Sequence, residues 1–113
     1  MFKRELAGEE KEFALPASTC AIWDIFYIVS MNPNRAQLGR IFAALIGLTL
    51  KNSTVPKYSL SDCDPIAYGG KVQEWLIKNK ISPVETLTVG TEILTYIQDH
   101  FVTSKEVEGA ENF

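Results

Sequence analysis

The chain has no cluster of basic residues. Its 11 lysines and arginines are spread over 113 positions, and Lys3-Arg4 is the longest run that they form. The 14 aspartates and glutamates bring the formal net charge to −3. Nucleic-acid-binding proteins normally carry a basic patch or stripe. We therefore expect no DNA or RNA partner.

Cysteine and histidine are also scarce, with two cysteines and one histidine. Cys20 lies in an apolar run and Cys63 in a polar segment, which favours two reduced thiols, while a structural disulfide stays open. These residues and the nearby Asp62 and Asp64 lack the paired spacing of a zinc site. His100 falls near the end of the last expected helix, where an imidazolium interacts well with the helix dipole. We expect no metal, no cofactor and no enzymatic activity.

No hydrophobic run is long enough to span a membrane. Residues 20–31 fall well short of the ~20 residues that cross a bilayer. Arg40 interrupts the next apolar stretch, and a charge at mid-helix is costly in lipid. The first ten residues contain no apolar run of signal-peptide length. We expect neither a membrane span nor an export signal.

Apolar side chains are abundant on every side of the helix expected at residues 20–31. Only Asp24 and Ser30 are plainly polar there, so the helix has no broad polar face for solvent. A helix that is apolar all round must be covered by other protein. The cover comes from the rest of the chain, from other copies of it or from a partner, which indicates an interaction protein. Three bulky residues are our candidates for an inter-subunit or partner surface: Ile22, Trp23 and Phe26.

The alternative is that these three residues are simply core, as large apolar side chains commonly are. A second candidate contact segment is the loop at residues 51–62, which is long for a compact domain. Its asparagine, proline and serine content is typical of a loop.

The predicted fold is mainly α, a small bundle of about four helices in one domain at residues 1–103. The helices are expected at residues 20–31, 33–50, 65–78 and from 83 onward. Four cap motifs mark their starts: Ser18 or Thr19, Asn32-Pro33, Asp64-Pro65 and the capping box Ser82-Pro83-Val84-Glu85.

A short β-hairpin is expected at the N-terminus, as an arm at residues 1–16. Phe2, Arg4 and Leu6 share one side of a period-two pattern, which is typical of half-buried strands. The alternative is a charged helix, because Glu, Lys, Leu and Ala are good helix formers. Pro16 ends the segment in either case.

The helix at 33–50 has one face of small residues. Gly39, Ala43 and Gly47 are spaced by four and leave a groove where another backbone can come close. We expect the helix at residues 20–31 to fill this groove within the chain, as the partner in an αα-hairpin. A groove for another molecule is the alternative.

The helix at 65–78 contains Gly69-Gly70, which costs ~1 kcal/mol per glycine relative to alanine. Close approach of another helix is the expected reason, and a kink is the alternative. In the last helix we expect Gly90 to break the helix in two and residues 104–113 to form a disordered acidic tail. Its predicted buried stripe is Val84, Leu87, Leu94, Ile97 and Phe101, with Val89, Ile93 and Tyr96 beside it.

Several short motifs resemble those of tail assembly chaperones from long-tailed bacteriophages. They are Ala67-Tyr-Gly-Gly-Lys-Val72, Trp75-Leu76, Ser82-Pro83 and Gly90, together with Phe13-Ala-Leu-Pro-Ala-Ser18 and the small-residue helix 39–50. The similarity covers roughly residues 10 to 100 and contains no catalytic signature.

The resemblance implies a small, mostly helical homo-oligomer that coats the tape measure protein in the host cytoplasm until tail-tube protein displaces it. Such a chaperone is absent from the mature virion, and Phe113 would end the shorter of two forms related by a frameshift. The resemblance adds three residues to the candidate partner contacts in the groove of helix 39–50: Tyr68, Gly69 and Gly70. The alternatives are a small helical adaptor or regulatory protein and a minor structural virion component.

Overall fold

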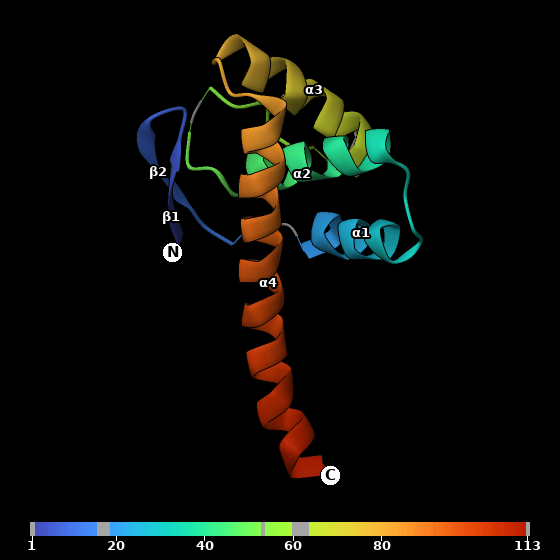
Figure 1. Ribbon diagram of the computed structural model, residues 1–113. Helices are drawn as coiled ribbons and strands as arrows, with labels where there is room; N and C mark the ends of the chain where they lie inside the picture. The colour runs from blue at the N-terminus through green and yellow to red at the C-terminus, as the bar shows by residue number, and fades with distance from the viewer. Residues whose placement is uncertain (1, 16–18, 53, 60–63, 113) are drawn as a thin grey trace.

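The computed structural model describes residues 2–15, 19–52, 54–59 and 64–112, with the backbone alone at 19–21 and 100–112. Within these residues the chain forms a two-stranded antiparallel hairpin followed by four helices (Figure 1). The elements are β1 Phe2–Leu6, β2 Glu9–Phe13, α1 Thr19–Ser30, α2 Arg35–Thr49, α3 Pro65–Lys78 and α4 Pro83–Asn112. The expected helical bundle with an N-terminal hairpin is confirmed.

The hairpin turns at Ala7 and Gly8, whose φ angles are 54° and 83°. Two successive positive φ values are what a two-residue turn of type I′ requires, and they match the twist of the paired strands. Leu6 and Phe13 are buried where the sheet meets the helices. The period-two pattern therefore predicted the strands correctly, and the charged-helix alternative is wrong.

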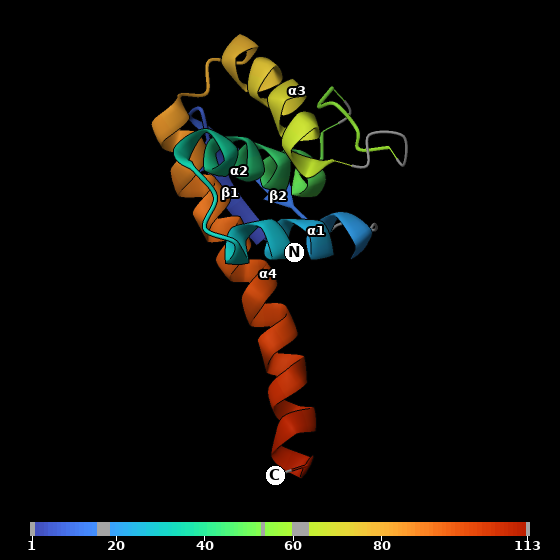
Figure 2. The same ribbon diagram turned by 90° about the vertical axis from the view of Figure 1, so that its right-hand side faces the viewer.

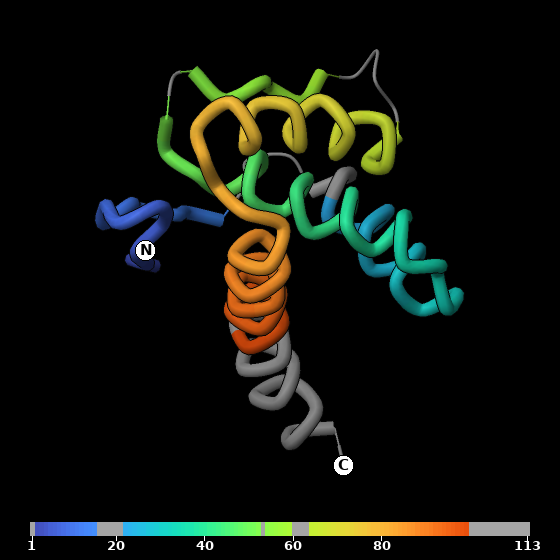
Figure 3. The backbone as a smooth tube through the Cα atoms, turned by 45° about the horizontal axis from the view of Figure 1, so that its top comes forward, coloured from blue at the N-terminus to red at the C-terminus, as the bar shows by residue number. Residues whose placement is uncertain are grey.

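β1 lies along α4. The Phe2 and Tyr96 rings are stacked at 5.4 Å, Arg4 forms an ion pair with Glu92, and the Ala7 amide donates to the Glu85 carboxylate. The first strand thus runs antiparallel to the helix, and its contacts follow one helix face. The hairpin and α1 lie on opposite sides of α4 (Figure 3). Because it is packed in this way, the hairpin belongs to the core of the molecule.

α2 is the central helix and lies between α3 on one side and α1 on the other (Figures 1 and 2). α4 crosses it at Gly90, where an added Cβ would lie 2.5 Å from Cβ of Phe42. The glycine permits this close helix crossing, and α4 continues through it unbroken. The expected break at Gly90 is therefore wrong.

The helix starts are partly as predicted. Asp64 caps α3 by accepting from the Ile66 amide at 3.0 Å, as expected. α2 begins at Arg35 and is capped by Asn34, which forms a capping box with Gln37. We expected Asn32 as the cap and Pro33 as the first helical residue. Asparagine is a favourable cap at either position. Asn34 prevails because a glutamine follows three residues later. Ser18 and the side chain of Thr19 lie outside the described residues.

The capping box of α4 is half formed. Oγ of Ser82 accepts from the Glu85 amide at 3.1 Å, but the Glu85 carboxylate binds Ala7 in the hairpin turn. The helical backbone of α4 continues to Asn112. The disordered tail expected at residues 104–113 stays a prediction.

The buried stripe of α4 matches the predicted one in part, because Ile97 and the flanking Val89 and Ile93 are buried as expected. Its inward residues are Thr86, Val89, Gly90, Ile93 and Ile97. Val84 and Leu87 are exposed instead of buried. Two apolar stripes of helical period overlap in this sequence, and the hairpin and α2 determine which of them faces inward. Phe101 lies outside the residues whose side chains are described.

Candidate interaction surface

The small residues of α2 form a close contact with α3. A Cβ on Gly47 would lie 2.6 Å from both Tyr68 Oη and Val72 Cγ2, and Ala43 is fully buried. A Cβ on Gly39 would lie 3.4 Å from Nε2 of Gln73, which also belongs to α3. At Ala43 and Gly47 the groove is therefore filled within the chain, as expected. The predicted occupant was wrong, because α3 takes the place that we assigned to residues 20–31.

Two residues of the segment 68–70, Tyr68 and Gly69, are buried against α2. A Cβ on Gly69 would overlap the carbonyl oxygen of Arg40, so the predicted close helix approach is present. Tyr68 is fully buried, and its hydroxyl donates to the carbonyl of Pro56 at 2.6 Å. Nothing lies within 4 Å of a Cβ on Gly70. Tyr68 and Gly69 thus serve the α2–α3 contact, which leaves them unavailable to a partner.

The loop after α2 is anchored where it is described. Besides the Pro56 bond, Nε1 of Trp75 donates to Oγ1 of Thr54 at 3.2 Å. Val55 is buried among the helices. Residues 54–59 therefore run along α3, and the predicted contact role has no support there. The remaining part at 60–62 lies outside the described residues.

α1 has an inward and an outward face, and both are apolar. Ile22 and Ile25 are buried in the core. Trp23, Tyr27 and Met31 are 76%, 67% and 62% exposed. Trp23 and Tyr27 are four apart and lie on one side of α1. Met31 follows directly after the last residue of the helix, and we call these three exposed side chains the α1 stripe.

The three sequence candidates in α1 thus have different positions. Ile22 is core, Trp23 faces outward, and Phe26 is half-buried beside the core. Tyr27 and Met31 were missed. Tyr27 is four residues and Met31 eight residues after Trp23, and this spacing of four was the available signal.

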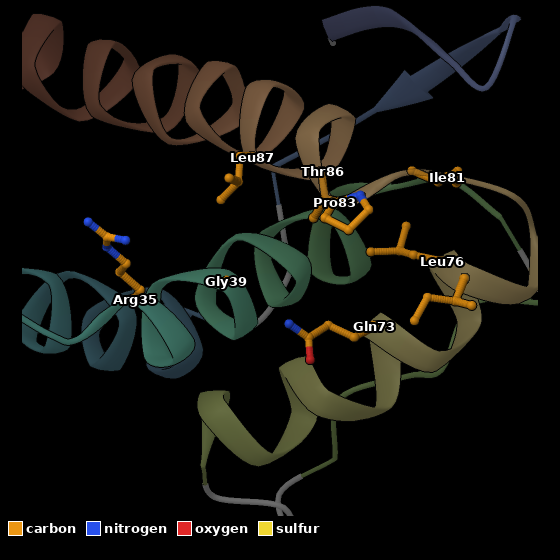
Figure 4. A pocket seen from close by; sticks show the side chains of 9 residues that line it. Arg35, Gly39, Gln73, Leu76, Ile81, Pro83, Thr86 and Leu87 are labelled. Carbon is orange, nitrogen blue, oxygen red and sulfur yellow. The ribbon is translucent and has the colours of Figure 1, made fainter.

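A second apolar surface lies where α2 begins, α3 ends and α4 begins (Figure 4). It is a groove of about 330 Å³, which we call the α3–α4 groove. Ile77 and Leu87 on its wall are 69% and 44% exposed, and Val84 on the same first turns of α4 is 74% exposed. The lining residues are Arg35, Gly39, Gln73, Leu76, Ile77, Ile81, Pro83, Thr86 and Leu87.

The α3–α4 groove has the chemistry of a packing site. Its polar side chains are Arg35, Gln73 and Thr86, and the Thr86 hydroxyl donates to the Ser82 carbonyl at 3.0 Å. No carboxylate, thiol or imidazole lines it. It is at the small end of ligand pockets. The groove therefore suits a bulky apolar side chain better than a reacting substrate.

Chemistry elsewhere in the described part of the chain is equally sparse. No group of three potential metal ligands occurs there, and no described helix is long and apolar enough to cross a membrane. Lys11 donates to Glu9 at 2.8 Å and lowers the pKa of that exposed carboxyl. Cys63 and Asp62 lie outside the described residues, as do the side chains of Cys20 and His100.

Comparison with known protein families, curated proteins and solved structures finds no match for this chain. Its function must therefore be inferred from the α1 stripe, the α3–α4 groove and the sequence motifs.

Proposed function

We propose that this chain is a self-associating helical chaperone that coats the tape measure protein during phage tail assembly. The motif resemblance supplies the class of partner. The α1 stripe is the observation that carries the proposal, because a single copy leaves three large apolar side chains in water. Apolar patches of this kind commonly mark interaction surfaces.

The size of the stripe supports weak, reversible association. Its three side chains expose roughly 450 Å², given the areas that aromatic residues typically bury. Burying that area contributes about 11 kcal/mol at 25 cal/mol per Å². Association costs an estimated ~4–15 kcal/mol in lost freedom of motion. The cost is of the same order as the gain, so the buried area of the stripe does not by itself give a tight contact.

Weak contacts suit a coat that must be removed. Many copies along one long helical protein bind strongly together, although each copy binds weakly. Tail-tube protein could then displace them one at a time. Under this proposal the chain acts in the host cytoplasm without enzymatic activity or a nucleic-acid partner, and it is absent from mature virions.

Co-expression with the tape measure protein tests the proposal. The wild-type chain should keep the tape measure protein in the supernatant after centrifugation. A Trp23→Ser/Tyr27→Ser variant should fold normally, because both side chains are largely exposed, yet leave the tape measure protein in the pellet. The control Lys57→Ser changes an exposed residue of the loop and should act as wild type.

A stripe variant that retains both self-association and full activity on the tape measure protein would refute the proposal. Detection of the chain in purified virions would favour a minor structural component instead. Failure of the wild-type chain to bind the tape measure protein would refute the assigned partner while leaving the α1 stripe as a contact surface.

A further inference from the structure

We infer that the α3–α4 groove receives the α1 stripe of a second copy of this chain. The inference deepens the proposed self-association and rests on it. It names both halves of the contact: three projecting side chains on one copy and the hollow lined by Ile77 and Leu87 on the next.

Charge complementarity supports this pairing. Asp24 is exposed next to Trp23, and Arg35 is exposed at the rim of the groove. Neither side chain forms an ion pair with any residue that the structure describes. When the stripe of one copy enters the groove of another, these opposite charges can meet across the contact. Complementary charges of this kind set the register of an interface.

The α1 stripe of one copy cannot enter the α3–α4 groove of the same copy. Ile22 and Ile25 hold the inward face of α1 in the core, so Trp23 and Tyr27 point away from the molecule. Turning them inward would expose both isoleucines. The occupant must therefore come from another chain.

Only the stripe-in-groove arrangement buries both apolar surfaces of every copy. Two stripes of roughly 450 Å² placed face to face would bury about 900 Å² in total and leave both grooves in water. When each copy uses both its stripe and its groove, it also buries the exposed side chains of its groove wall, Ile77 and Leu87. The buried apolar area per copy then rises well above that of the stripe alone.

Two variants separate these arrangements. Trp23→Asp places a charge in the α1 stripe and leaves the α3–α4 groove unchanged. Ile77→Asp places a charge in the groove and leaves the stripe unchanged. Both side chains are largely exposed, so both variants should fold, as circular dichroism can verify. Light scattering should find each variant monomeric alone and an equal mixture forming a 1:1 heterodimer, because one intact stripe then meets one intact groove.

The competing stripe-on-stripe dimer predicts a different pattern. In that case Ile77→Asp would associate like wild type, and the mixture would contain no heterodimer of the two variants. Either result would overturn the inference, as would a wild-type chain that stays monomeric at all accessible concentrations.

The charges give an independent test. Asp24→Arg and Arg35→Asp should each weaken self-association about tenfold at low salt, since each places like charges across the contact. The double variant should regain most of the loss, and the differences should shrink as salt screens the exposed charges. A double variant no better than the single ones would overturn the assigned register.

The tape measure assay separates this inference from the proposed function. If the mixed variants form a heterodimer but the wild-type chain leaves the tape measure protein insoluble, the stripe-in-groove contact stands and the proposed function fails. If the wild-type chain protects the tape measure protein but the mixture forms no heterodimer, the proposed function stands and the inference fails.

Discussion

Lys80 has a backbone conformation that favours glycine. Its φ is 62°, and it follows the last residues of α3. The amide of Lys80 donates to the Ile77 carbonyl, and that of Ile81 donates to the Leu76 carbonyl. This pair of bonds is the Schellman motif, with Ile81 packed among the buried residues near Leu76. Because lysine has a Cβ, this backbone conformation is strained at Lys80.

We therefore expect Lys80→Gly to stabilise the protein by about 1 kcal/mol, the cost of a left-handed conformation for a residue other than glycine. Urea denaturation measures the change. Glu74→Gly, in the exposed interior of α3, is the control and should destabilise by up to ~1 kcal/mol. Loss of stability in Lys80→Gly would contradict this account of the motif.

Gly69 and Gly70 are neighbours with opposite expected responses to alanine. At Gly69 the new methyl group would overlap the Arg40 carbonyl, a backbone atom that cannot move without separating α2 from α3. Gly69→Ala should therefore cost about 1–3 kcal/mol or more.

Gly70→Ala should stabilise by about 0.5–1 kcal/mol, because its Cβ meets nothing within 4 Å and alanine is the better helix former. Thermal denaturation of the two variants side by side tests the pair. Equal effects would show that the α2–α3 crossing is looser than the structure places it.

At the scale of elements, the hairpin is a part of the core. Phe13 of β2 is fully buried, packs 5.6 Å from the Phe2 ring and pairs with Leu50 at the end of α2. Phe13→Ala should cost about 3–5 kcal/mol, as for other buried aromatic side chains. That is a large share of the ~5–15 kcal/mol that stabilises an ordinary domain.

Chemical denaturation of Phe13→Ala beside Lys3→Ala checks this expectation. Lys3 is exposed on β1, so its truncation should change stability by no more than ~0.5 kcal/mol. Equal stability of the two variants would show that the hairpin is dispensable for folding.

At the scale of the whole molecule, self-association should couple to stability. A partner that binds only the folded state stabilises it by mass action. The melting temperature of the wild-type chain should therefore rise with protein concentration. The Trp23→Ser/Tyr27→Ser variant should melt at one temperature over the same range, which differential scanning calorimetry can measure. A wild-type melting temperature that does not change with concentration would argue against association through the α1 stripe.

The sequence by itself determined where most elements lie. Asp64-Pro65 predicted the start of α3, the alternation at residues 2–6 predicted β1, and the glycines of α2 and α3 predicted a close helix crossing. These features depend on caps, turns and side-chain period, which act over a few neighbouring residues. The proposed partner rests on the sequence motifs alone.

Only the tertiary structure decided which faces meet. α3 fills the small-residue groove of α2, Val84 and Leu87 of α4 face outward, and α1 buries Ile22 while exposing Trp23. Each of these helices offers more than one apolar face of the same period. The choice between faces depends on contacts between residues far apart in the chain, to which the local pattern does not respond.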